Sequence, residues 1–135
     1  MKATIIYPTA EKIIEYNLLV ITLIPAKKSD QVKVLSRQKL ENIIRECREL
    51  NGDLYDKAVF LLSNLIRQHP FASGNRRTAL VTTKEFLLQN HERFKIEDNP
   101  NHAKVLLGIR ERFYKDEEVK EWIKYGRIRE FSRFK

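Results

Sequence analysis

The chain has 135 residues, of which 42% are hydrophobic and 33% charged, and this is sufficient to bury one core without disulfides or metal ions. The low content of 4 Gly and 4 Pro argues against long disordered stretches, and the single cysteine excludes an internal disulfide framework. A formal net charge of +8 favours negatively charged partners such as nucleotides, nucleic acid or an acidic protein, although such basic surfaces also occur without one.

The sequence also bears on location and on metal binding. Residues Met1–Ile6 lack the layout of a signal peptide, and the longest apolar run, Leu18–Ile24, is too short to span a bilayer. We therefore expect a cytoplasmic protein with no membrane partner. Cys47 stands at helical spacing among apolar residues, which favours a small buried side chain over a nucleophile. One Cys and three scattered His do not make a zinc site.

The N-terminal part of the chain predicts a short β-like segment and two helices. The β-like start covers Thr4–Tyr7, and Thr9 is a suitable N-cap for a helix that continues through Asn17-Leu18. Residues Pro25–Lys33 are polar and predict a loop or a short hairpin. An amphipathic helix is then expected over Val34–Leu50.

The central part predicts two helices joined by a short loop. Asn51-Gly52 ends the preceding helix, and Asp53 is a typical cap for a helix over Leu54–Gln68. That helix is apolar around most of its circumference, which places it in the middle of a bundle. His69-Pro70 then interrupts the helical pattern, and a further helix is expected over Asn75–Asn90.

The C-terminal part predicts two shorter helices, Asn101–Phe113 and Asp116–Tyr125, after a turn at Asp98-Asn99-Pro100. The basic end, residues 127–135, is expected to be frayed or to depend on a partner for its order. The sequence therefore predicts an all-α bundle that forms a single domain over residues 1–126, with a basic tail and at most a short strand or a flap hairpin.

One stretch, His69-Pro70-Phe71-Ala72-Ser73-Gly74-Asn75-Arg76-Arg77, combines an imidazole, a Gly-Asn turn and two guanidinium groups ahead of a helix. A loop that leads into a helix N-terminus suits an anion, because unpaired N–H groups point outward there. Gly74 would let the backbone approach a phosphate, and the side chains of Asn75, Arg76 and Arg77 can donate to its oxygens. His69 could accept a proton from a hydroxyl at neutral pH.

Each of these residues has an ordinary explanation when it is taken alone. A His before Pro is more often a cap or a surface residue than a base, and two arginines at a helix start are usually a solvated face that opposes the helix dipole. Phe71 is best explained as a buried anchor for the loop. The order and spacing of the whole set, rather than any single residue, favour a functional site.

The stretch resembles the motif of the Fic/Doc family, His-Pro-Phe-x-(Asp/Glu)-Gly-Asn-(Gly/Lys)-Arg, and chain length and helix order are similar to its small Doc-type branch. The resemblance implies a helical Fic/Doc-type bundle. It also implies that His69 is the base on a target hydroxyl and that Gly74, Asn75 and Arg77 hold the phosphates of ATP. Arg76 fills a slot that is Gly in many AMP-transferring members and Lys in Doc-like ones.

Two further expectations follow from the resemblance. Family members carry a flap ahead of the motif that docks the target by strand-like pairing, and Pro25–Lys33 with Lys27 and Lys28 is the best candidate for it. The acidic residue of the motif, which helps to hold Mg²⁺, is replaced by Ser73. A hydroxyl is a weaker Mg²⁺ ligand, so the sequence predicts weak metal dependence or reduced activity.

Three functions compete at this point. The first is a Doc-like toxin-type transferase that moves a phosphoryl or adenylyl group from ATP to a protein hydroxyl, with a translation factor among the candidate targets. The second is a catalytically weakened Fic-fold module that binds nucleotide or protein, and the third is a basic nucleic-acid binder. The inhibitory signature (Ser/Thr)-x-x-x-Glu-(Gly/Asn) fails at Glu41-Asn42 because Arg37 stands in the hydroxyl position. Restraint of an active enzyme would then require a separate antitoxin or low activity.

Overall fold

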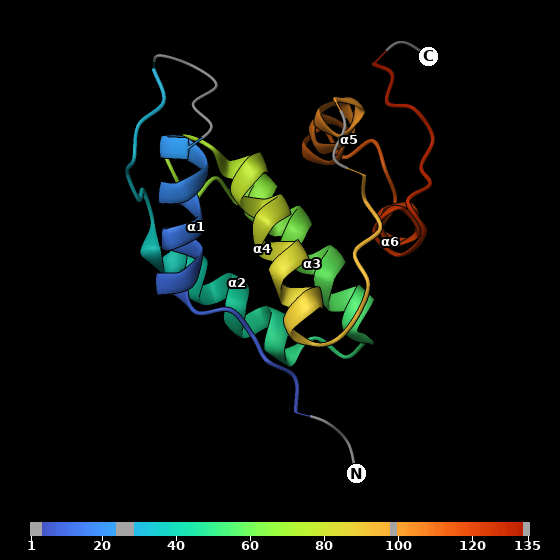
Figure 1. The fold of residues 1–135 in the computed structure, drawn as a ribbon, viewed down its shortest axis with the longest axis horizontal. Coiled ribbons are helices and arrows are strands. Elements are labelled where there is room, and N and C mark those ends of the chain that lie inside the picture. The colour runs from blue at the N-terminus through green and yellow to red at the C-terminus, as the bar shows by residue number, and fades with distance from the viewer. Residues whose placement is uncertain (1–3, 24–28, 98–99, 134–135) are drawn as a thin grey trace.

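The structure is a computed structural model that describes residues 4–23, 29–97 and 100–133 (Figure 1). It confirms the all-α class: the described residues form helices, with an isolated antiparallel bridge between Val34 and Phe71 and no sheet. The helices are α1 (Ala10–Leu23), α2 (Arg37–Glu49), α3 (Leu54–Gln68), α4 (Asn75–Gln89), α5 (Asn101–Arg110) and α6 (Asp116–Tyr125). None of them is both long and apolar enough to cross a membrane.

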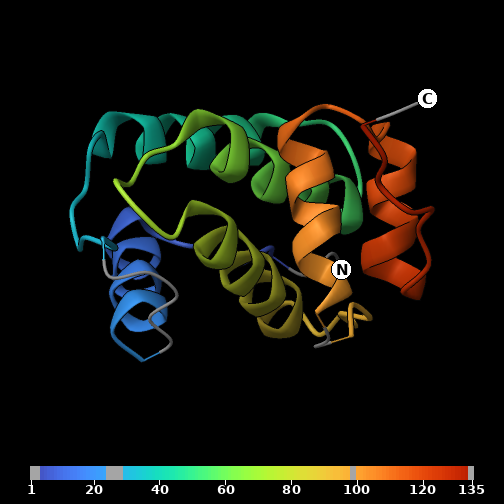
Figure 2. The same ribbon diagram turned by 90° about the horizontal axis from the view of Figure 1, so that it is seen from above.

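Helix α3 lies at the centre of the bundle, as its nearly continuous apolar surface predicts. It packs against α2, α4, α5 and α6, whereas α1 packs on α2 and α4. Figures 1 and 2 show α1 and α2 at one end of the molecule and α5 and α6 at the other. The buried apolar residues of α3 are Tyr55, Ala58, Val59, Leu61, Leu62, Leu65 and Ile66. The loop that follows α3 is therefore mounted on the most buried element of the fold.

Side-chain caps set the ends of the helices. Asp53 accepts from the Asp56 N–H, and the Asp56 carboxylate accepts from the Asp53 N–H, so a capping box starts α3 where the sequence predicts. Helix α2 begins three residues later than expected, at Arg37, because the Ser36 hydroxyl caps it. The N–H groups of Leu35 and Ser36 donate to Pro70 O instead of continuing a helix.

The N-terminal segment is held by a side chain rather than by a strand. Ile6 donates its N–H to Asn90 Oδ1 and accepts from Asn90 Nδ2, each at 2.8 Å. The amide of Asn90 thus replaces the partner strand that the β-like pattern of Thr4–Tyr7 would need, and the described residues of that segment form no strand. The Thr9 hydroxyl accepts from the Lys12 N–H, which confirms Thr9 as the cap of α1.

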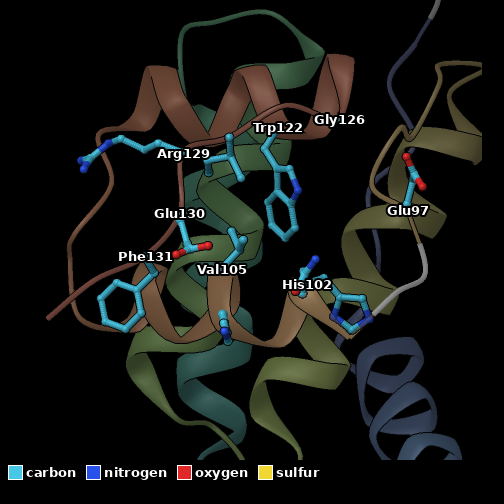
Figure 3. Close-up of a pocket in the computed structure, with 11 residues that line it drawn as sticks. Glu97, His102, Val105, Trp122, Gly126, Arg129, Glu130 and Phe131 are labelled. Atoms are coloured by element: carbon cyan, nitrogen blue, oxygen red, sulfur yellow. The ribbon is translucent and has the colours of Figure 1, made fainter.

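The basic tail folds back on the domain, so the expectation of a frayed end is wrong for residues 127–133. Ile128 and Phe131 pack against the core, and Tyr114 Oη donates to Arg129 O at 2.9 Å. A hollow of about 250 Å³ lies between α5, α6 and the tail, and Trp122 and Phe131 are among its lining residues (Figure 3). The aromatic and aliphatic side chains of the tail supply a hydrophobic contact that its basic composition conceals.

A buried lysine joins α3 to the end of α2. The Lys57 ammonium donates to the carbonyls of Cys47, Arg48 and Leu50 at 2.9, 3.2 and 2.7 Å. The Cys47 and Arg48 carbonyls lie in the last turn of α2 and Leu50 is its C-cap, where C=O groups lack the usual partner within the helix. Cys47 is fully buried, as predicted, and burial raises the pKa of its thiol to about 11.

We predict that Lys57→Met destabilises the fold by about 2–3 kcal/mol, since three carbonyls lose a charged donor while the apolar contacts of the stem are kept. Urea unfolding measures the change. The matched control is Lys84→Met on the exposed face of α4, where we expect a change within about 0.5 kcal/mol. Equal midpoints for the two variants would contradict the capping role.

Candidate functional site

The loop between α3 and α4 turns through two left-handed residues. His69 ends α3 with φ 50° and ψ 61°, and Gly74 precedes α4 with φ 75°. Glycine adopts this region without strain, but a histidine that precedes Pro70 does so at a cost of about 1–3 kcal/mol. The surrounding contacts therefore have to hold His69 in place.

The side chain of Asn75 supplies the main contacts of this kind. Its Oδ1 accepts from the Phe71 N–H at 3.0 Å, and its Nδ2 donates to Phe71 O at 2.8 Å. The same Nδ2 lies 3.2 Å from His69 Nδ1. Asn75 is buried, and both the oxygen and the nitrogen of its side-chain amide form hydrogen bonds with the loop. In this structure the Asn75 amide holds the imidazole of His69 in position, whereas its predicted contact with phosphate stays a prediction.

These contacts decide the protonation of the imidazole. The two hydrogen bonds to Phe71 fix which end of the Asn75 amide faces the ring, so an N–H points at Nδ1 and the neutral ring carries its proton on Nε2. Burial, together with the positive charges of Arg110, Lys39 and Arg76, lowers the pKa of His69. This shift favours the neutral ring, the form that a general base requires.

Phe71 anchors the loop in the core, as the sequence predicts. Its side chain is fully buried, and its backbone bridges to Val34. On either side of this bridge, Ala72 N donates to Lys33 O at 3.0 Å and Leu35 N donates to Pro70 O at 2.8 Å. The segment ahead of α2 therefore pairs with the motif loop itself.

Helix α1 holds the other end of the loop through a buried asparagine. Asn17 Nδ2 donates to Ser73 O at 2.9 Å and to Thr78 Oγ1 at 3.0 Å. A Cβ on Gly74 would lie 3.2 Å from Ile21 Cγ1 and 3.3 Å from Asn17 Nδ2, which leaves little room for a side chain. The glycine thus serves both the left-handed turn and the close packing of the loop on α1.

Arg77 is engaged in the structure by groups of α1 and of the segment before α2. It donates to Val20 O at 3.1 Å and forms an ion pair with Asp30 at 3.0 Å. The Asp30 carboxylate is only 9% exposed, so solvent screens this pair less than a surface pair. A phosphate that bound to Arg77 would have to compete with Asp30.

A cavity of about 770 Å³ opens over the loop, and its walls bring together every described residue that the sequence predicted for the site. Those residues are His69, Ser73, Gly74, Asn75, Arg76 and Arg77. Lys27 and Lys28 lie outside the described residues. The opposite wall belongs to α5, which contributes His102, Lys104 and Arg110. The cavity falls in the size range of small-ligand sites.

The donor set of this cavity does not fit Mg²⁺ in the observed arrangement. Mg²⁺ usually takes one or two carboxylates besides phosphate oxygens, and the only carboxylate in the lining of the described cavity is that of Asp30, which is paired with Arg77. The Ser73 hydroxyl accepts from the Gln31 N–H at 3.0 Å. Nowhere in the described parts of the chain do three or more His, Cys, Asp or Glu side chains gather as a metal site would need.

Sequence reasoning missed Asn17, Asp30 and Arg110. A polar residue on the buried face of a helix, as Asn17 is, gives a usable signal, because it must find partners when it is buried. Asp30 and Arg110 reach the cavity only through tertiary packing, and no local pattern marks either of them. The positions of Asp30 and Arg110 at the cavity are therefore evident only from the structure.

Comparison with known families agrees with the geometry. The sequence model of the Fic/DOC family matches residues 25–87, a region that runs from the segment before α2 almost to the end of α4. No curated protein matches the sequence closely enough to count as a relative.

We predict that ¹⁵N NMR of the His69 ring at neutral pH shows a protonated Nε2 and an unprotonated Nδ1, because the Asn75 amide donates to Nδ1. His91, which is exposed, serves as the reference ring in the same spectrum. A protonated Nδ1 on His69 would show that the Asn75 amide does not set the tautomer.

Proposed function

Because the chain belongs to the Fic/DOC family, we propose that it transfers a phosphoryl or adenylyl group from a nucleoside triphosphate to the hydroxyl of a Ser, Thr or Tyr in a target protein. The observation that carries the proposal is the position of His69 at the wall of a cavity that is lined by cations and by the start of α4, where burial and neighbouring positive charges lower the pKa of the imidazole. A helix N-terminus and guanidinium groups together suit polyphosphate.

In this reaction His69 accepts the proton of the target hydroxyl, and the hydroxyl oxygen attacks phosphorus. Attack at the γ-phosphorus releases the nucleoside diphosphate, and attack at the α-phosphorus releases pyrophosphate. To accept at Nε2, the ring must move its own proton to Nδ1 and give up the contact with Asn75. That contact is long, at 3.2 Å, so its loss costs no more than one ordinary hydrogen bond, about 1 kcal/mol.

The Doc-like phosphoryl transfer is the version that we favour. Arg76 puts a positive charge where many AMP-transferring members have Gly, and added positive charge suits a terminal phosphate. On this proposal a translation factor is a candidate target, and a separate antitoxin is the candidate restraint. The mass added to a modified target distinguishes the two reactions, since phosphate and AMP differ.

A weakened binding module is the second candidate, and specific contacts favour it. Ser73, Arg77 and the Nδ1 of His69 each bond to groups of the protein in this structure. A site whose motif groups are occupied in this way could bind nucleotide without turning it over. ATP binding without any labelled product would select this candidate.

We expect incubation with labelled ATP and a cell extract to label a protein, and His69→Ala to lower that labelling at least about 100-fold, because general-base help is worth about 10²–10⁴ in rate. His91→Asn, which changes an exposed histidine outside the cavity, is the matched control. Undiminished labelling by the His69→Ala variant would show that His69 is not the general base.

The pH dependence of labelling gives a second test. The pKa of His69 is lowered by burial and by neighbouring cations, and the base must be neutral, so activity falls only when the pH drops through a value below the usual ~6.5. At sub-saturating ATP, where the pH profile reports the free protein, the rate should therefore be nearly unchanged between about pH 8 and pH 6.5. An acid limb at or above pH 6.5 under that condition would contradict the environment assigned to the ring.

A further inference from the structure

Arg110 is the last residue of α5, and it lies outside the region that matches the family. It nevertheless lines the same cavity as His69 and Arg76. The wall that it belongs to is separate in sequence from the motif by more than a full helix, and only the packing of α5 on α3 brings it there. The cavity therefore receives cations from two independent elements.

Arg76 and Arg110 place two positive charges in the lining of the same cavity. Neither has an ion-pair partner within the ranges that the structure describes, whereas Arg77 is paired with Asp30. Arg76 is half-buried. Burial and the charges of Arg110 and Arg77 lower the pKa of Arg76, in keeping with the shared lining of the cavity. Two cations that repel one another in a cavity are best explained by an anionic ligand that lies between them.

We propose that Arg110 is a phosphate-binding residue and that Arg76 and Arg110 together hold the polyphosphate of the nucleotide, in place of a metal ion. The assignment rests on the proposed function for the nucleotide, but the binding step can be tested without transfer. Each guanidinium offers a planar fork of donors that matches two phosphate oxygens. Arg77, in contrast, is occupied by Asp30 and contributes to phosphate binding only if that pair opens.

The test is calorimetric titration of the full chain with sodium tripolyphosphate, in EDTA and at fixed ionic strength. We expect wild type to bind tripolyphosphate without metal, and Arg110→Gln to bind it about 10- to 100-fold more weakly, as expected for the loss of one charged donor group. Arg127→Gln removes the same charge from an arginine that is 74% exposed and outside the cavity, so it should stay within about two-fold of wild type. Melting temperatures of both variants report whether the fold is kept.

Three results would overturn the proposal: no binding by wild type, unchanged binding by Arg110→Gln, or an equal loss in Arg127→Gln, which would indicate general charge attraction. An ATP titration in the same buffer should show the same loss, whereas an adenosine titration should show none. If binding depends on Arg110 but no protein is ever labelled, the phosphate site stands and the transferase proposal fails. If labelling occurs while Arg110→Gln binds normally, the reverse holds.

Discussion

The hydrogen bonds between the Asn75 side chain and the Phe71 backbone hold the loop on which the other features of the site depend. They close a short ring of residues at the start of α4 and, through the same amide, orient the imidazole of His69. The left-handed backbone of His69 is strained. It is kept because the hydrogen bonds between Asn75 and Phe71 and the burial of Phe71 hold the loop in this conformation. The orientation of the His69 ring and the stability of the loop thus rest on one amide group.

Electrostatics divides the arginines of the site into two kinds. Arg77 is fixed by Asp30 and by α1, so its charge stabilises the position of the segment before α2 against the loop. Arg76 has no such partner among the described residues, and together with Arg110 it leaves the cavity with uncompensated positive charge. Arg76 and Arg77 are neighbours in the sequence but differ in role, because Arg77 is paired with a carboxylate whereas Arg76 shares the cavity with a second cation.

The sequence predicts those parts of the fold that local physics controls. The bounds of α3 and α6 follow from apolar spacing and from capping residues, and both are as expected. Helix α2 begins later than its pattern suggests because Leu35 and Ser36 donate to Pro70, a residue far along the chain. The motif residues could be located from the sequence, but their partners could not, since Asp30 and Asn17 reach the loop only through tertiary packing.

The proposed phosphate site also bears on how His69 would work. The charges of Arg110 and Arg76 add to burial in lowering the pKa of His69, which favours a neutral but weakly basic ring. A polyphosphate between the two guanidinium groups would offset this field, because its negative charge favours the protonated imidazole. The basicity of His69 would then rise when the nucleotide is bound and the target hydroxyl has to lose its proton. On the proposed function, charge on α5, outside the motif, would thereby couple nucleotide binding to proton transfer.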